Sequence, residues 1–244
     1  MQKALLWLLF AVGCSCGSSE RGMLRIGIDP SWAPLDFGAM QPYVNGYTED
    51  CLLEIARHSG HKFEKIDANW DALFEGMKSG SYDAILTSLP PYEFNLASYD
   101  FSDNFLAIGP VLIVPKESSR SKLEKLSEQL VGIVQGDPAA LVLEKYPTII
   151  IRTYDSIPAL FDSIVMGEIS AGLVDALRAT NYVRDLYSAS LKIASKPLTD
   201  QGLHLIALKG RQEHFIHLFN ETLEKMTKKK ELVKLQAKWN LQGS

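Results

Sequence analysis

Stretches typical of β-strands alternate with stretches typical of helices along most of this chain. Residues 23–29, 62–66 and 82–87 are short stretches that are predicted to form strands. Between them, residues 49–58 and 70–77 carry apolar side chains at helical spacing, and each run is soon followed by a glycine of the kind that ends helices. Strands separated by helices of this length pair in parallel. The pattern therefore predicts an α/β fold.

One helix–glycine–strand pattern occurs twice. Residues 73–88 (LFEGMKSGSYDAILTS) and residues 160–175 (LFDSIVMGEISAGLVD) share Leu, Phe, Gly and Ala at a constant offset of 87. Chance similarity within common α/β patterns is the alternative to an internal repeat. A repeat predicts two lobes of related design, in which the strands end at Ser88 and Asp175. Open α/β sheets bind ligands outside these carboxyl ends, so two facing lobes would close on a ligand.

The remaining patterns complete the second lobe and its connections. Strands are predicted at residues 131–134 and 149–152, and Ser156 is placed to cap the repeated helix. The apolar runs 107–114 and 203–208 lie outside both repeats and are predicted to cross between the lobes. The expected fold is two-lobed, with two parallel or mixed sheets flanked by helices and joined by two crossover strands.

The expected domain boundaries follow from these crossings. Residues 23–108 and 202–244 are assigned to the first lobe, and residues 109–201 to the second lobe. The C-terminal stretch 215–239 repeats apolar residues at helical spacing, so it is predicted to form two helices. The basic run 228–230 between them is interpreted as a solvated turn, and less plausibly as a patch for a partner.

The N-terminus has the layout of a secretion signal. Lys3 precedes the apolar run 4–12, and small Gly13 and Cys14 follow it. The run is far shorter than the ~20 residues that span a bilayer. Residues 1–22 are therefore predicted to be a signal peptide and tether. Ala-Val-Gly-Cys also resembles a bacterial lipobox, which predicts lipidation of Cys14 and a lipid-anchored periplasmic protein, or else a protein secreted after cleavage.

Charge and motifs exclude several classes of function. The formal net charge is −4, so a basic nucleic-acid binder is not expected. The three cysteines and five histidines show no metal-binding spacing. No Ser-His-Asp or Cys-His signature points to nucleophilic catalysis. The expectation is a chain with no metal or cofactor.

Five stretches in order carry a family resemblance: residues 29–37 (DPSWAPLDF), 46–50 (GYTED), 70–85, 100–103 (DFSD) and 131–136 (VGIVQG). With them the chain resembles the family 3 bacterial extracellular solute-binding proteins, the polar-amino-acid receptors of ABC importers. The resemblance implies a type II periplasmic-binding fold and a monomer that is not an enzyme. It also implies capture of a small ligand by lobe closure and delivery to an ABC permease in the cytoplasmic membrane.

The resemblance assigns two tryptophans and two acids to the cleft. In relatives, aromatic side chains at the positions of Trp32 and Trp70 sandwich the ligand. An indole offers apolar area and attracts cations, although both residues could instead pack in the core. Asp175 stands where relatives pair with the ligand's ammonium group, and it could also cap the following helix. Asp29 matches an acid that often lines this cleft.

The carboxylate-binding half of the family site departs from the pattern. Relatives use a small-hydroxyl loop and an Arg, which binds carboxylates in a bidentate way. Here the loop contains Thr87, Ser88 and Leu89, and Asn95 stands where the Arg is expected. The second-lobe helix start, usually Gly-Thr, is Gly136-Asp137, and Asp137 could equally be a helix cap before a proline.

The sequence therefore favours a ligand with an amine and a masked or absent carboxylate, such as an amine, a short peptide or an amino-acid derivative. An ordinary amino acid would need Ser88, Asn95 and backbone amides, or Arg178 or Arg152, to replace the missing group. Two alternatives remain: a cyclohexadienyl-dehydratase-like enzyme, with Glu93, Asp29 or Asp137 as the acid, and a sensory or adhesive lipoprotein.

Overall fold

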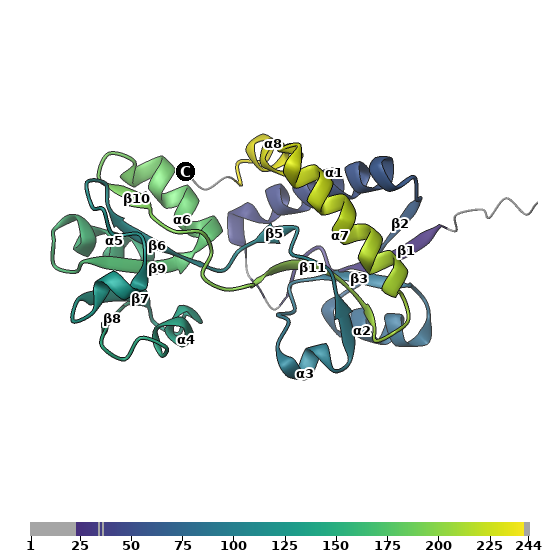
Figure 1. The fold of residues 1–244 in the computed structure, drawn as a ribbon, viewed down its shortest axis with the longest axis horizontal. Helices are drawn as coiled ribbons and strands as arrows, with labels where there is room; N and C mark the ends of the chain where they lie inside the picture. Colours follow the sequence, from purple (N-terminus) through teal and green to yellow (C-terminus); the bar gives the residue numbers. More distant parts are fainter. Residues whose placement is uncertain (1–22, 34, 36, 242–244) are drawn as a thin grey trace, which may run out of the picture.

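The computed structural model describes residues 23–33, 35 and 37–241, which form two α/β lobes side by side (Figure 1). The expected secretion signal, residues 1–22 with Cys14, lies outside the described residues. In the described part of the chain, no helix has the length and apolarity needed to cross a membrane. Each lobe contains one mixed sheet covered by helices, as the strand–helix alternation predicts.

The first sheet has the strand order β2-β1-β3-β11-β4, and β5 pairs with β11. Parallel pairing joins β1 to β2 and β3, whereas β11 is antiparallel to β3, β4 and β5. The central strand β3 is buried along its whole length, and the edge strand β2 is mostly exposed. The strands are β1 (Leu24–Ile28), β2 (Phe63–Asp67), β3 (Ala84–Thr87), β4 (Tyr99–Phe101), β5 (Leu106–Ala107) and β11 (Gly202–Leu208).

The second sheet has the strand order β10-β6-β9-β7-β8. The strand β7 is parallel to β8 and β9, and β6 is antiparallel to β9 and β10. Alternate residues of β6 belong to cores on opposite faces: Leu112 and Val114 to one, Val111 and Ile113 to the other. The strands are β6 (Pro110–Pro115), β7 (Leu130–Val134), β8 (Ile150–Tyr154), β9 (Ala171–Asp175) and β10 (Leu191–Ile193).

Two segments of chain connect the lobes, and they run side by side. The expected strand over residues 107–114 is two strands, because the ladder is interrupted between β5 in the first sheet and β6 in the second. The returning segment, residues 194–201, leads from β10 to β11. The amides of Ile108 and Gly109 both donate to the carbonyl oxygen of Gln201, at 3.0 Å each. The crossing is therefore a narrow, hydrogen-bonded pair of segments.

The repeated helix–glycine–strand unit is present in both lobes. The helix α2 (Trp70–Ser79) is capped by Asn69, and α5 (Ile157–Val165) is capped by Ser156; each cap accepts from the backbone amide three residues ahead. Gly80 and Gly167 follow them with φ of 77° and 76°, a left-handed conformation that glycine adopts at little cost. The repeat therefore reflects shared local chemistry as well as shared topology.

The helix α1 (Gln41–Ser59) begins eight residues earlier than the sequence pattern predicts. The predicted start is Glu49, and Pro42 and Gly46 lie before that residue. Pro42 instead lies in the first turn, where no intrahelical amide bond is lost. Gly46 is tolerated because the ring of Trp239 packs against it, leaving no room for a side chain.

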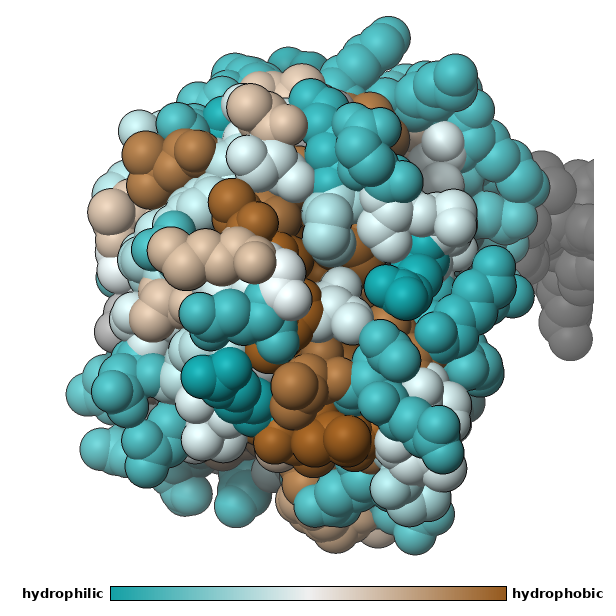
Figure 2. Space-filling model, turned by 90° about the vertical axis from the view of Figure 1, so that its left-hand side faces the viewer, coloured by the Kyte–Doolittle hydropathy of each residue, from teal (hydrophilic) through white to brown (hydrophobic). Residues whose placement is uncertain are grey.

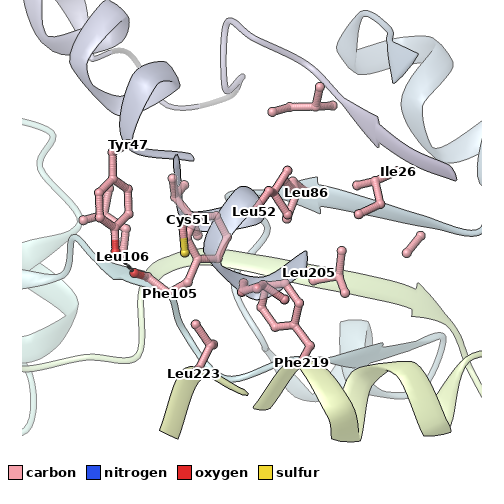
Figure 3. Packing of buried hydrophobic residues seen from close by; sticks show 14 of the residues in the cluster. Ile26, Tyr47, Cys51, Leu52, Leu86, Phe105, Leu106, Leu205, Phe219 and Leu223 are labelled. Atoms are coloured by element: carbon pink, nitrogen blue, oxygen red, sulfur yellow. Dashed lines mark hydrogen bonds between the residues drawn. The ribbon is translucent and has the colours of Figure 1, made fainter. Parts of the chain in front are cut away.

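The largest hydrophobic core lies in the first lobe, where α1 and α7 (Glu213–Lys228) pack on the sheet (Figure 3). Phe219 and Leu223 of α7 point toward Cys51 and Phe105 in this view. The fully buried Tyr47 donates its hydroxyl hydrogen to the carbonyl oxygen of Phe105 at 2.5 Å, which satisfies its one polar group. Cys51 is buried and unpaired, and burial raises its thiol pKa to about 12.

The C-terminal stretch forms two helices, as predicted. The helix α7 is followed by α8 (Glu231–Lys238), and Lys230 turns the chain between them with φ 58°. Beyond α8, the carbonyl oxygen of Asn240 accepts from Arg184 of the second lobe at 3.4 Å, and Leu241 is buried in the first-lobe core. The same core contains Leu177 of α6 (Ala176–Tyr182), so the lobes touch beyond the crossing itself.

Replacing Asp83 by asparagine is expected to reduce the stability by about 1 kcal/mol near pH 6, because Arg25 and Asp83 are both partly exposed. Partial burial alone would raise the pKa of Asp83, but three hydrogen bonds and the charge of Arg25 outweigh it and lower that pKa. The stabilisation is therefore present above the ordinary pKa of aspartate, and it is lost as the pH falls through the lowered value. Urea unfolding at pH 6 and pH 3 measures this; an equal cost at both would contradict it.

Candidate ligand-binding site

Both sheets turn the carboxyl ends of their parallel strands toward the crossing. In the first sheet, Thr87 at the end of β3 pairs with His204, three residues into β11. In the second sheet, Asp175 at the end of β9 pairs with Pro110, the first residue of β6 after the crossing. Loops that follow β1, β3, β7 and β9 therefore meet between the lobes, which is where ligands bind to open α/β sheets.

Asp29 follows β1 and is 6% exposed. Its Oδ1 accepts from the backbone amide of Ser31 at 2.9 Å and from the Ser31 hydroxyl at 2.7 Å, which folds the loop into a tight turn. Within the described chain, Oδ2 makes no hydrogen bond and is not sealed off from solvent. A buried carboxylate with one oxygen left over is suited to accept a cationic donor.

Trp32 does not line the cleft in this structure, contrary to the expectation from the sequence. Its side chain is 1% exposed and belongs to the first-lobe core, so it offers no ring face to a ligand. Its Nε1 donates to Oδ1 of Asn45 on α1 at 2.6 Å. The backbone is left-handed, with φ 61°, which turns the indole inward and is unusual for a bulky residue.

The loop after β3 holds itself together with its own polar groups. Thr87 Oγ1 accepts from the amide of Leu89 at 3.1 Å, and the Ser88 hydroxyl donates to the Trp32 carbonyl oxygen at 3.2 Å. Asn95, at the position expected for Arg, is buried in α3 (Glu93–Leu96) and donates Nδ2 to the Pro90 carbonyl oxygen at 2.9 Å. Asn95 therefore stabilises the loop through this hydrogen bond. An Arg at the same position would add a positive charge that could bind a carboxylate.

Trp70 is half-buried at the start of α2. Its ring meets Phe74 edge-on, with centroids 5.0 Å apart, and packs against the core formed by Leu73, Met77 and Tyr82. Part of the indole is therefore packed in the core, which is one of the two roles that the sequence allows for Trp70. The partly exposed remainder leaves the predicted ligand contact open to test.

In the second lobe, Arg178 joins the two predicted acids. Asp175 caps α6, since its Oδ1 accepts from the Arg178 amide at 2.9 Å, and its Oδ2 pairs with Arg178 Nε. Arg178 Nη2 also pairs with Asp137 Oδ2 at 3.1 Å. Asp137 lies beside left-handed Gly136 and accepts from the amide of Ala139 at the start of α4 (Ala139–Leu143). Asp175 is thus the N-cap of α6, as the alternative interpretation held, whereas the N-cap of α4 is Pro138 and Asp137 lies one residue before it.

The charges of this cluster do not balance, because two carboxylates share one guanidinium. Burial raises the pKa of Asp175, and the nearby Asp137 acts in the same direction, whereas Arg178 lowers it. The side chain of Asp137 is 8% exposed and that of Arg178 is 49% exposed. One negative charge therefore remains at the carboxyl ends of β7 and β9. The other candidate cation, Arg152, reaches Glu168 on the surface at 3.5 Å.

Of the cavities between the described parts of the two lobes, two have volumes above 500 Å³. One, of about 540 Å³, lies between Pro90–Tyr92 of the first lobe and α4 of the second. The other, of about 610 Å³, lies between residues 37–43 at the start of α1 and residues 178–185, which include Arg178 of α6 and Arg184 just after it. Among the described residues, no group of His, Cys, Asp and Glu side chains is arranged to hold a metal ion.

The family model for bacterial extracellular solute-binding proteins, family 3, matches residues 24–242. This chain belongs to that family. Two-lobed solute-binding proteins bind their ligands between the lobes. In this chain the carboxyl ends of the parallel strands of both sheets also face that region.

Three relatives of the family 3 protein are similar in sequence over most of their length. This chain is 23% identical to a probable histidine-binding protein of Neisseria gonorrhoeae, over 96% of this chain and 94% of that one. It is 24% identical to the L-cystine-binding protein TcyJ of Escherichia coli, over 90% and 83% of the two chains. It is 23% identical to the arginine-binding extracellular protein ArtP of Bacillus subtilis, over 96% and 97%.

Solved structures confirm the two-lobed, type II periplasmic-binding fold of the family 3 protein. The L-cystine solute receptor of Neisseria gonorrhoeae, in an unliganded open conformation, superposes with a TM-score of 0.68 at 18% identity, over 90% of this chain and 93% of that one. A substrate-binding domain of a putative amino acid ABC transporter from Streptococcus pneumoniae gives 0.65 at 22% identity, over 88% and 99%.

Proposed function

We propose that this family 3 protein is the substrate-binding component of an ABC importer and that it captures an amine-bearing solute between its lobes. The ligand is an amino acid, or a derivative or short peptide that carries an amine. The observation that carries the proposal is the position of Asp29 and Asp175 at the carboxyl ends of β1 and β9, on either side of the crossing. Asp29 has a carboxylate oxygen without a hydrogen bond to any described residue, whereas Asp175 would share its carboxylate between Arg178 and an ammonium group.

The scarcity of cations near the first-lobe loops supports an amine as the recognised group. No Lys or Arg occurs between Lys78 and Lys116, and Asn95 braces its own loop. Arg178 is the exception in the second lobe, and its two carboxylate partners leave an excess of negative charge. A ligand with a masked or absent carboxylate therefore fits better than a free amino acid.

Binding rather than catalysis is proposed as the whole activity. The three relatives described above are named as binding proteins. Asp137, one of the acids considered for a dehydratase, already accepts from Ala139 and Arg178. The sensory or adhesive alternative has no observation of its own in the structure.

The cellular context is proposed from the family and the sequence. The family is extracellular, and we place this chain in the periplasm, anchored through lipid on Cys14 after removal of the signal. Its partner is an ABC permease of the cytoplasmic membrane, and the protein works as a monomer. The domain boundaries proposed are residues 23–108 with 202–244, and residues 109–201.

The Asp29→Asn variant is expected to bind an amine ligand about 10- to 100-fold more weakly, since a hydrogen bond to a charged group contributes about 1.5–3 kcal/mol. Asparagine keeps an Oδ1 that accepts from Ser31, so the turn is preserved while an amide group replaces the free oxygen.

The ligand is first found by thermal shift of residues 23–244 with free amino acids, amines and short peptides. At 100 times its dissociation constant, a ligand adds about 2.7 kcal/mol to the stability.

The control is Asp155→Asn, an exposed acid that lines neither of the interlobe cavities described above. Equal affinity of the Asp29→Asn and Asp155→Asn variants would refute the amine site. Catalytic turnover of any ligand found would refute the proposal of binding alone. A shift only with free amino acids, abolished in the Arg178→Gln variant, would show that Arg178 replaces the missing Arg and that the masked-carboxylate argument is wrong.

A further inference from the structure

The cavity between Pro90–Tyr92 and α4 is built mainly from apolar side chains. Its volume is about 540 Å³, within the range of small-molecule sites. Five prolines form much of its wall, and only two charged residues line it. The lining residues are Pro90, Pro91, Tyr92, Pro110, Leu123, Pro138, Leu141, Val142, Lys145, Tyr146, Pro197, Leu198, Thr199, Asp200 and Gln201.

Two large side chains of this cavity are exposed to water in the structure. Tyr92 of the first lobe is 51% exposed, and Leu141 of α4 is 56% exposed. A leucine side chain gains free energy when more of its apolar surface is removed from water. Figure 2 views the outer end of the second lobe, where apolar side chains also lie in the lower part, whereas the cavity is on the side of this lobe that faces the first lobe. The exposed parts of Tyr92 and Leu141 are apolar surface within the cavity. An apolar group that entered the cavity would cover such surface.

Three lining residues of the cavity are neighbours of the strand-end acids or of the first-lobe loop, although those acids do not line it themselves. Pro138 follows Asp137 in the chain, and Pro90 follows Leu89 of the first-lobe loop. Pro110 pairs directly with Asp175 in the ladder between β6 and β9. Side chains of directly paired residues lie on the same face of a sheet. A ligand whose amine lies at the strand ends can therefore extend into this cavity.

Lys145 is the one cationic side chain among the described residues that line the cavity. Lys145 is exposed, and its ammonium group makes no ion pair with any described residue. It follows Pro138 by seven residues along α4 and the turn after it, a rise of roughly 10 Å at helical spacing. An extended chain covers about 3.3–3.6 Å per residue, so two or three residues bridge this interval.

We propose that this cavity is a subsite for the apolar side chains of a di- or tripeptide, and that Lys145 pairs with the peptide's terminal carboxylate. The inference rests on the proposed function for the amine end and names the substrate class that the same site takes. In a di- or tripeptide the terminal carboxylate is separated from the amine by the length of the peptide. Lys145 therefore pairs with a carboxylate that is not adjacent to the amine, as it would be in a free amino acid. This accounts for Asn95 at the position where relatives have an Arg.

The test uses calorimetric titration of residues 23–244 with Leu-Leu, Leu-Leu-Leu, their C-terminal amides, and free leucine. We expect the peptides to bind more tightly than leucine. The Lys145→Gln variant should lose about two- to fivefold in affinity for the free-acid peptides at low salt, the size of an exposed ion pair, and nothing for the amides. Lys145→Arg should restore binding, and Lys125→Gln, an exposed lysine outside the cavity, is the matched control.

A second variant tests the apolar subsite. Leu141→Gln keeps the size of an exposed side chain and is expected to weaken peptide binding about five- to tenfold, with an unchanged melting temperature. If leucine binds as tightly as the peptides, or if neither variant changes peptide affinity, the inference is overturned. If the peptide subsite fails this test but the Asp29→Asn variant still loses binding, the proposed function remains supported. Failure of both Asp29 and Lys145 variants to affect any ligand would overturn both proposals.

Discussion

The Trp32→Ala variant is expected to lower the free energy of unfolding by about 3–5 kcal/mol in the absence of any ligand, as other large core truncations do. The indole is 1% exposed in the first-lobe core, and its Nε1 is hydrogen-bonded to Asn45. Truncation would leave a cavity and remove the donor that holds α1 against the loop after β1. Chemical denaturation of residues 23–244 measures the loss directly.

The partly buried Trp70 provides the comparison for Trp32. Because part of its ring is already exposed, Trp70→Ala should cost less stability than Trp32→Ala. The two variants separate a core role from a ligand role for each indole. If Trp32→Ala kept the unfolding free energy of the unmodified protein and lost ligand affinity, the indole would face the cleft and the buried position described here would be wrong.

The Gly46→Ala variant is expected to destabilise the protein by about 1–3 kcal/mol, the usual cost of overpacking. A Cβ on Gly46 would lie 2.2–2.5 Å from three ring atoms of Trp239. That ring is rigid and is held by Asp50, which accepts from its Nε1 at 2.7 Å. The clash must therefore exceed the gain of about 1 kcal/mol that alanine brings to a helix interior. Thermal or urea unfolding gives the value.

The same substitution should change sign when the ring is absent. In a Trp239→Ala background, Gly46→Ala is expected to stabilise the protein by up to about 1 kcal/mol, because helix propensity then acts alone. This double-mutant cycle isolates the contact between α1 and the end of α8. A cost of Gly46→Ala that is the same in both backgrounds would show that the two residues do not interact.

Most of the fold could be predicted from the sequence because its signals are local. Glycines at positions 80 and 167 end helices that begin after Asn69 and Ser156, and the structure has both units as the repeat predicts. The short elements were harder. The strand β4, the strand β10 and the helix α3 have three or four residues each, too few for a periodic pattern to emerge.

The site could be predicted in part. The acids Asp29 and Asp175 lie at strand ends, as the alternation of strands and helices indicates. The pairing of Arg178 with Asp137 and Asp175 joins residues 41 positions apart, and only the spacing of three between Asp175 and Arg178 hinted at it. The apolar cavity draws on the first-lobe loop, α4 and the returning crossing segment, so no single stretch of sequence indicates it.

Local sequence signals are enough to predict the α/β class, the two lobes, the ends of the repeated helices and the acids at the strand ends. These depend on hydrophobic periodicity and capping, which act over a few residues. The tertiary structure alone decided that Trp32 turns into the core, that α1 begins before Gly46, and that Arg178 joins two acids. Each depends on which surfaces meet after folding, because burial and charge pairing are set by neighbours far away in the chain.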